Sequence, residues 1–328
     1  MKISKLLLAA VAAFGMGGSA SAADFNLRIH TLVKSPHPYN DMAAFLKEDI
    51  EAKSDGRIAV RIFDSGQLGQ DPAVISEIGL GTIDMMISTT SNAVQQVPEY
   101  AIFTMPYIFT SMDDALAKVG PGTPIEAHFQ KVYEERGLNM KLLALGASGT
   151  RNMSTAETVV NGPDDLKGLK MRTPPSPMDS KTWAAFGMLP VTVAWGELYA
   201  AMQTGVAQAM ESSLPGYTGS KLYEVAPNLA LTAHTIQVNH TSISNRTWNK
   251  LPEDLQKIVQ ASAIEANKLG VEKAKQYDDE LVSELETKHG VKVTRPDTAA
   301  FIEVLAPIQT ELAKELDLED EYALVKAK

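Results

Sequence analysis

Hydrophobic patterns typical of strands and of helices alternate along the first third of this 328-residue chain. Apolar residues at every second position predict strands near 25–29, 58–62 and 83–87. Between them, apolar residues spaced three and four apart predict helices near 38–50 and 74–78. This strand–helix–strand rhythm favours an α/β domain with a mostly parallel sheet.

The same rhythm returns in the second half of the chain. Strands are expected at 141–145, 169–171 and 206–210, and helices at 176–186 and 197–203. Residues 81–88 and 205–212 resemble each other, since each has a glycine, an apolar-rich strand and a polar cluster in that order. We therefore expect two α/β lobes of similar plan, in agreement with a usual domain size of about 150 residues.

A much longer helix is predicted over 252–289. It begins with a proline and two acidic residues, which suit the first turn of a helix, and it ends at Gly290. At 1.5 Å per residue such a helix is about 55 Å long. We expect it to span both lobes, with a bend at Gly270.

The first 22 residues have the pattern of an export signal. Lys2 and Lys5 precede an apolar run at 6–17, and Ala20-Ser21-Ala22 supplies the small residues that precede a cleavage site. The apolar run is shorter than the roughly 20 residues that cross a bilayer. We expect cleavage near Ala22 and a periplasmic protein.

Composition and missing motifs argue against several functions. With no cysteine, the chain has no thiol nucleophile and no disulfide, and a net charge of −10 disfavours a nucleic-acid partner. No P-loop, dinucleotide fingerprint, nucleophile elbow or His-Glu-x-x-His pattern occurs. We expect no enzyme activity, no cofactor and no metal, and keep as the alternative an exported enzyme with Glu197 or Glu211 as its base.

Polar residues gather where the predicted strands end, which is where ligands bind in open α/β sheets. Arg172 is the most informative, because Thr173-Pro174-Pro175 stops its strand at once and fixes where the side chain emerges. A guanidinium group matches a carboxylate with two parallel hydrogen bonds. A structural salt bridge is the alternative for this arginine and for Arg151. The other candidates at strand ends or near them are Thr31, Thr89, Thr90, Ser91, Glu211, Ser212 and Asn239.

Trp195 precedes the helix expected at 197–203. Its ring either packs back on the first turn near Tyr199 or forms a wall of the ligand cleft.

Several stretches together resemble the substrate-binding proteins of TRAP (tripartite ATP-independent periplasmic) transporters. They keep the family order over nearly the whole chain after residue 22: Gln67-Leu-Gly69, Gly81-Thr-Ile-Asp84, Met105-Pro-Tyr-Ile-Phe109, Gly149-Thr-Arg151, Asp164-Asp-Leu-Lys-Gly-Leu-Lys-Met-Arg172, Glu197-Leu-Tyr-Ala-Ala-Met-Gln-Thr-Gly205, Lys221-Leu-Tyr-Glu-Val225 and Leu251-Pro-Glu-Asp-Leu255.

The resemblance implies a two-lobe periplasmic-binding-protein fold with a hinge, an interlobe cleft and a long helix across both lobes. The expected division is 23–148 with 238–277 for lobe I, and 149–237 with 278–328 for lobe II. In this family an arginine corresponding to Arg172 takes the substrate carboxylate. Arg151 resembles a second arginine of the site, and Trp195 an aromatic against the ligand. Ser212 stands where many members have asparagine, while Thr31 and Thr89 occupy ligand-facing positions.

The function that the resemblance implies is capture of a small organic acid, of the C4-dicarboxylate or sugar-acid type, by a monomeric protein that hands it to a TRAP membrane permease. A periplasmic ligand sensor of the same fold is the second alternative.

Overall fold

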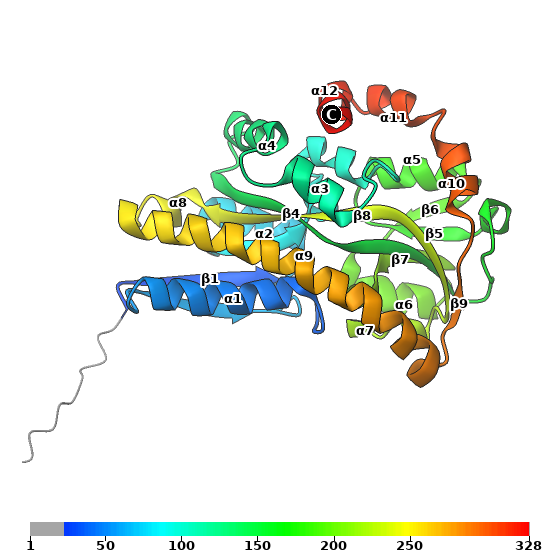
Figure 1. Cartoon of the computed structure of the whole chain (residues 1–328), viewed down its shortest axis with the longest axis horizontal. Helices are drawn as coiled ribbons and strands as arrows, with labels where there is room; N and C mark the ends of the chain where they lie inside the picture. The colour runs from blue at the N-terminus through cyan, green and yellow to red at the C-terminus, as the bar shows by residue number, and fades with distance from the viewer. Residues whose placement is uncertain (1–22, 328) are drawn as a thin grey trace, which may run out of the picture.

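The computed structural model describes residues 23–327, so the predicted export signal at 1–22 lies outside the described residues. Within 23–327, no helix combines the length and the apolar character that crossing a bilayer requires. The chain forms two α/β lobes joined through one sheet (Figure 1).

The sheet has the strand order β2-β1-β3-β8-β4-β7-β5-β6, with β9 also paired to β8. Its strands are β1 (Phe25–Thr31), β2 (Ile58–Phe63), β3 (Met85–Thr89), β4 (Met140–Thr155), β5 (Lys170–Thr173), β6 (Leu189–Thr192), β7 (Ala209–Ser213), β8 (Asn228–Ser244) and β9 (Lys292–Thr294). The first three strands belong to one lobe and β5 to β7 belong to the other.

The long strands β4 and β8 pass through both lobes. In the middle of the sheet, β4 and β8 pair with each other along their length. The end of β8 also pairs with β3 of one lobe, and the end of β4 pairs with β7 of the other. All three of these pairings are antiparallel. The pairings within each lobe, β1 with β2 and β3 and β5 with β6 and β7, are parallel as expected, so the sheet as a whole is mixed. The predicted strand at 141–145 is only the first part of β4, and β7 begins three residues later than expected.

Helices cover both faces of the sheet. They are α1 (Pro38–Lys53), α2 (Asp71–Leu80), α3 (Met112–Val119), α4 (Pro124–Glu135), α5 (Pro177–Ala185), α6 (Leu198–Gln203), α7 (Leu214–Gly219), α8 (Asn245–Trp248), α9 (Glu253–His289), α10 (Thr298–Leu305), α11 (Gln309–Glu315) and α12 (Glu319–Lys326). The predicted helices at 38–50, 74–78, 176–186 and 197–203 correspond to α1, α2, α5 and α6.

The long helix α9 crosses the molecule from α1 to α7 (Figure 1). Leu255 and Val259 near its start pack in the core under α1, and Leu281 and Leu285 near its end pack in the core beside α7. It runs uninterrupted through Gly270, where an added Cβ would lie 2.6 Å from the sulfur of Met42. The glycine therefore lets α9 approach α1 closely, rather than marking a break in the helix.

The C-terminal helix α12 packs on α4. His128 Nε2 lies 2.6 Å from Glu321 Oε1, and Val325 joins the hydrophobic core that contains Phe129. The residue bounds of the lobes remain a prediction. By these bounds α12 belongs to lobe II, whereas the helix that it contacts, α4, belongs to lobe I.

Gly146 of β4 marks a second close approach of α9. A Cβ there would lie 3.0 Å from Asn267 Cγ, and Asn267 is buried and hydrogen-bonded to Asn239 at 2.7 Å and to the Ala263 carbonyl at 2.9 Å. We expect Gly146→Ala to lower the free energy of unfolding by about 2 kcal/mol, because the new methyl group displaces this amide. Chemical denaturation measures the change. Gly162→Ala is the matched control, since a Cβ there meets nothing within 4 Å, and equal effects of the two substitutions would contradict the packing argument.

Candidate functional site

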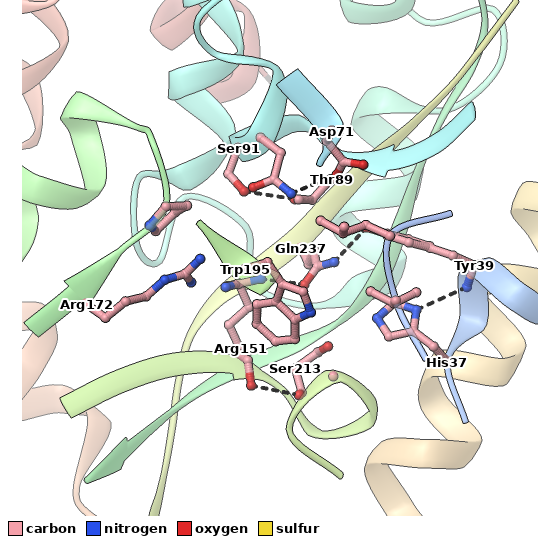
Figure 2. Close-up of a pocket in the computed structure, with 16 residues that line it drawn as sticks. His37, Tyr39, Asp71, Thr89, Ser91, Arg151, Arg172, Trp195, Ser213 and Gln237 are labelled. Carbon is pink, nitrogen blue, oxygen red and sulfur yellow. Dashed lines mark hydrogen bonds between the residues drawn. The ribbon is translucent and has the colours of Figure 1, made fainter. Parts of the chain in front are cut away.

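A cavity of about 440 Å³, counting the space at its mouth, lies between the lobes (Figure 2). Its volume is in the usual range for small-molecule sites. Lobe I contributes the starts of α1 and α2 and the residues after β3, and the other lobe contributes the ends of β5 and β7. The lining side chains that matter below are His37, Tyr39, Asp71, Thr89, Ser91, Asn92, Arg151, Arg172, Trp195, Ser212, Ser213 and Gln237.

Arg172 points into this cavity from the end of β5 (Figure 2). The residue is only 1% exposed, and its Nε donates to the Val193 carbonyl at 2.9 Å, which fixes the plane of the guanidinium. Neither terminal nitrogen has a hydrogen-bond partner within residues 23–327, and the indole of Trp195 lies 5.6 Å away. Burial lowers the pKa of Arg172 to about 10, and the neighbouring Arg151 adds to this lowering while Glu211 opposes it.

Arg151, by contrast, is already paired. Its Nε and one terminal nitrogen donate to the two carboxylate oxygens of Glu211, and the other terminal nitrogen donates to Gln237 Oε1 at 2.6 Å. Burial alone would raise the pKa of Glu211, but Arg151 and His234 together outweigh burial and hold that pKa well below its usual range. Both members of the pair are therefore ionised, and their charges cancel. In the described part of the chain, Arg172 is then the cation of the cavity wall that has no counterion.

The wall formed by α1 is polar and uncharged. His37 Nδ1 accepts from the Tyr39 backbone N–H at 3.2 Å, so the ring hydrogen of the neutral form sits on Nε2. Burial, helped by Arg151, lowers the pKa of His37 to about 3, and burial raises the pKa of Tyr39 to about 12. The Tyr39 hydroxyl accepts from Gln237 Nε2 at 2.6 Å, which links this wall to Arg151.

Six of the predicted site residues lie together on the cavity wall: Thr89, Ser91, Arg151, Arg172, Trp195 and Ser212. The two interpretations given for Trp195 are compatible with each other, since its side chain lines the cavity and also packs in the hydrophobic cluster that contains Tyr199.

The other predicted residues do not line this cavity, and each one has a hydrogen-bond or ion-pair partner inside the protein. The Thr31 hydroxyl donates to Asn40 Oδ1 at 2.6 Å, and the Asn239 amide donates to Asn267 on α9. The Glu211 carboxylate binds Arg151. Thr90 donates to the Val238 carbonyl at 3.2 Å and lines a smaller cavity next to Arg151.

Sequence reasoning missed His37, Tyr39, Asp71, Asn92 and Gln237. His37 and Asp71 each begin a helix shortly after a strand of the sheet, at His37-Pro38 and Asp71-Pro72. A search of helix starts as well as strand ends would have found these two. Gln237 lies in the middle of the long strand β8, and no local signal marks it.

The mouth of the cavity is narrowed by a contact between the lobes. The Gly196 backbone N–H donates to Gln70 Oε1 at 3.2 Å, and a Cβ on Gly196 would lie 2.5 Å from Gln70 Nε2. Lys34 and Lys221 line the groove outside this contact. The lobes therefore touch directly around the entrance.

Comparisons with known proteins agree on one family. The sequence model of the bacterial extracellular solute-binding proteins, family 7, matches residues 29–316. A solute-binding protein of Sulfitobacter sp. strain NAS-14.1 is 29% identical, covering 100% of this chain and 98% of its own. The sialic acid-binding periplasmic protein of Vibrio cholerae is 30% identical over 83% of each chain.

Solved structures show the same architecture. A TRAP periplasmic solute-binding protein from Polaromonas sp. JS666, bound to D-erythronate, superposes with a TM-score of 0.85 at 26% identity, covering 93% of this chain and 99% of its own. A TRAP periplasmic solute-binding protein from Roseobacter denitrificans, with bound L-galactonate, has a TM-score of 0.82 at 26% identity, covering 94% and 100%.

Asp179 on α5 lines the smaller cavity, and burial together with the charge of Glu211 raises its pKa to about 7. An acid with a raised pKa in the folded state stabilises the protein below about pH 4, and this contribution is lost as the pH rises through 7. We expect Asp179→Asn to increase the free energy of unfolding at pH 8 by on the order of 2 kcal/mol and to have little effect at pH 4.

Denaturant titrations of both proteins at pH 4 and pH 8 measure this difference. Asp164→Asn is the control, because Asp164 is 89% exposed. A stability difference that is the same at both pH values would contradict the raised pKa.

Proposed function

The chain belongs to family 7 of the bacterial extracellular solute-binding proteins and is a TRAP transporter substrate-binding protein, and on this premise we propose that Arg172 captures a small organic-acid anion for delivery to the membrane permease. The anion is of the C4-dicarboxylate or sugar-acid type. Proteins of this family work in the periplasm, which agrees with the export signal predicted from the sequence.

One observation carries the proposal: the guanidinium of Arg172 is buried and oriented by Val193, and its two terminal nitrogens have no hydrogen-bond partner within residues 23–327. Burying a charge without a counterion is costly, so such a group is kept where a ligand supplies the opposite charge. Because Nε already donates to the Val193 carbonyl, the two terminal nitrogens are left to donate end-on to both oxygens of a carboxylate. Trp195 then offers an apolar wall beside that carboxylate.

The ligands of related proteins support the same chemistry. Erythronate, galactonate and sialic acid, which the relatives named above bind, are all hydroxylated carboxylic acids. A guanidinium that takes the carboxylate is compatible with all three.

The two-lobe arrangement suggests how binding is coupled to delivery. A ligand held by Arg172 in one lobe also contacts the walls that α1 and α2 of lobe I contribute. Such a ligand binds the closed conformation of the protein more tightly than the open one. It therefore increases the fraction of protein molecules that are closed. We propose that the permease recognises this closed, loaded form.

The alternative of an exported enzyme has less support. Of the two bases considered for it, Glu211 is ion-paired with Arg151, and Glu197 is exposed and not part of the cavity wall. A ligand sensor would share the binding site, and it is distinguished from a transport protein by whether uptake of the acid depends on the permease.

We expect Arg172→Ala to weaken binding at least tenfold, and Arg172→Lys not to restore it, because an ammonium group cannot bind both carboxylate oxygens side by side. Binding at micromolar affinity corresponds to about −8 kcal/mol, and truncating one partner of a buried charge pair typically costs about 2–5 kcal/mol. The probe is the acid that gives the largest stabilisation in a thermal-shift screen of organic acids, and calorimetry measures its dissociation constant.

The control is Arg295→Ala, since the Arg295 side chain is 61% exposed and pairs with Glu286. Unchanged affinity in both Arg172 variants would remove this residue from the site and overturn the proposed mechanism.

We expect the acid to be released chemically unchanged after prolonged incubation with the protein. Mass spectrometry of the recovered ligand tests this, with a ligand sample incubated alone as the control. A product that accumulates in proportion to protein concentration would favour the enzyme.

A further inference from the structure

Asp71 brings a buried negative charge to the wall of the cavity. It is the first residue of α2 and only 1% exposed, and it lies with Thr89 and Ser91 on another side of the cavity from Arg172 (Figure 2). Its Oδ1 lies 3.0 Å from His30 Nε2, while its Oδ2 accepts from Asn92 Nδ2 at 2.8 Å and from the Ser88 hydroxyl. Three donors converging on one carboxyl group are the pattern of an ionised, acceptor-only carboxylate.

His30 does not supply a clear counterion for this charge. Its Nδ1 is buried and has no partner within residues 23–327. A hydrogen on Nδ1 would thus be a buried donor without an acceptor, which is costly. The hydrogen bonds therefore favour the neutral ring with its hydrogen on Nε2, and Asp71 keeps its negative charge.

The charges around the cavity then leave room for one ligand anion. The cationic side chains that line it are Arg151 and Arg172, and Glu211 already neutralises Arg151. His37 cannot add a positive charge, because burial lowers its pKa to about 3. One ligand carboxylate on Arg172 therefore uses the free cation, and a second carboxylate would meet Asp71 with no positive group beside it.

The same wall is suited to hydroxyl groups. Asp71 can accept a further hydrogen bond at Oδ1, which has one partner in the protein. Thr89 and Ser91 add hydroxyls that donate or accept. We infer that Asp71 makes the site selective for a hydroxylated monocarboxylate, with the carboxylate on Arg172 and a hydroxyl donating to Asp71, and that it rejects the dicarboxylate of the same carbon skeleton.

This inference rests on the proposed function, since it takes Arg172 as the carboxylate partner, and it narrows the ligand class by its charge. Two pairs of acids test it, because within each pair a terminal CH₂OH is replaced by a second carboxylate: D-erythronate with meso-tartrate, and L-galactonate with galactarate. The acid selected by the thermal-shift screen is tested in the same way against its dicarboxylate counterpart. In each pair of which a member binds, we expect calorimetry at about neutral pH to show the monocarboxylate binding at least tenfold more tightly than the dicarboxylate.

Asp71→Asn removes the charge with little change of shape, and we expect it to reduce the ratio of the two affinities to less than threefold. Asp164→Asn makes the same chemical change on the surface and should leave the ratio unaltered. Asp71→Ser is a second variant, in case an amide next to the Asn92 and Ser88 donors disturbs folding. The readout is the ratio of the affinities of the two acids for the same variant. A substitution that weakens the binding of both acids equally leaves this ratio unchanged and therefore does not produce the expected result.

A dicarboxylate that binds the unaltered protein as tightly as its monocarboxylate partner would overturn this inference and leave the proposed function intact. A tenfold preference that persists in both Asp71 variants would also overturn it. If none of the acids binds and the screen selects a solute whose affinity is independent of Arg172, the proposed function fails and the inference fails with it.

Discussion

The bidentate pairing of Arg151 with Glu211 determines what the rest of the site can do. The Glu211 side chain is buried and that of Arg151 is 12% exposed, and strands β4 and β7 place them side by side although they are 60 residues apart in the chain. The pairing cancels one of the two positive charges that line the cavity. The other, on Arg172, has no counterion among residues 23–327 and lies where burial disfavours an isolated charge. Removing Glu211 would leave two adjacent buried cations, so the selectivity of the site for a single carboxylate depends on this internal pair.

The elements that cross both lobes hold the walls of the cavity in register. Strands β4 and β8 and helix α9 each contribute residues to both lobes, and two glycines let α9 lie close to its neighbours, Gly146 against Asn267 and Gly270 against Met42. Arg172 in one lobe and Asp71 in the other are thereby presented to the same space. A ligand that satisfies both must be long enough to reach across, and this links recognition of the ligand to closure of the lobes.

The parts of the fold that follow from local patterns could be predicted from the sequence, and those that depend on distant pairing could not. The periodic apolar positions of α1, α2 and α9 are local, as is the double proline that fixes Arg172 at the end of β5. The full length of β4 was missed because Gly146 and Gly149 interrupt its apolar pattern, while its partner strand β8 begins more than 70 residues further along the chain. Thr31 was assigned to the site from its place at a strand end and from the family resemblance, and Asn239 as a polar residue near a strand end, but their side chains bond to Asn40 and Asn267. The position of a polar residue at a strand end thus does not by itself separate a residue that lines the cavity from one whose side chain is used inside the protein.

An anion-binding site in a chain with a net charge of −10 is consistent with electrostatics, because distance and salt decide which charges act. At physiological ionic strength the field of a surface carboxylate is screened over about 8 Å, while charges within the cavity interact through protein and are screened much less. A ligand is therefore affected mainly by Arg172, by the neutral Arg151–Glu211 pair and by Asp71. Arg172 attracts a carboxylate and Asp71 favours a hydroxyl donor. The orientation of a bound ligand therefore follows from the charges at the cavity and not from the net charge of the chain.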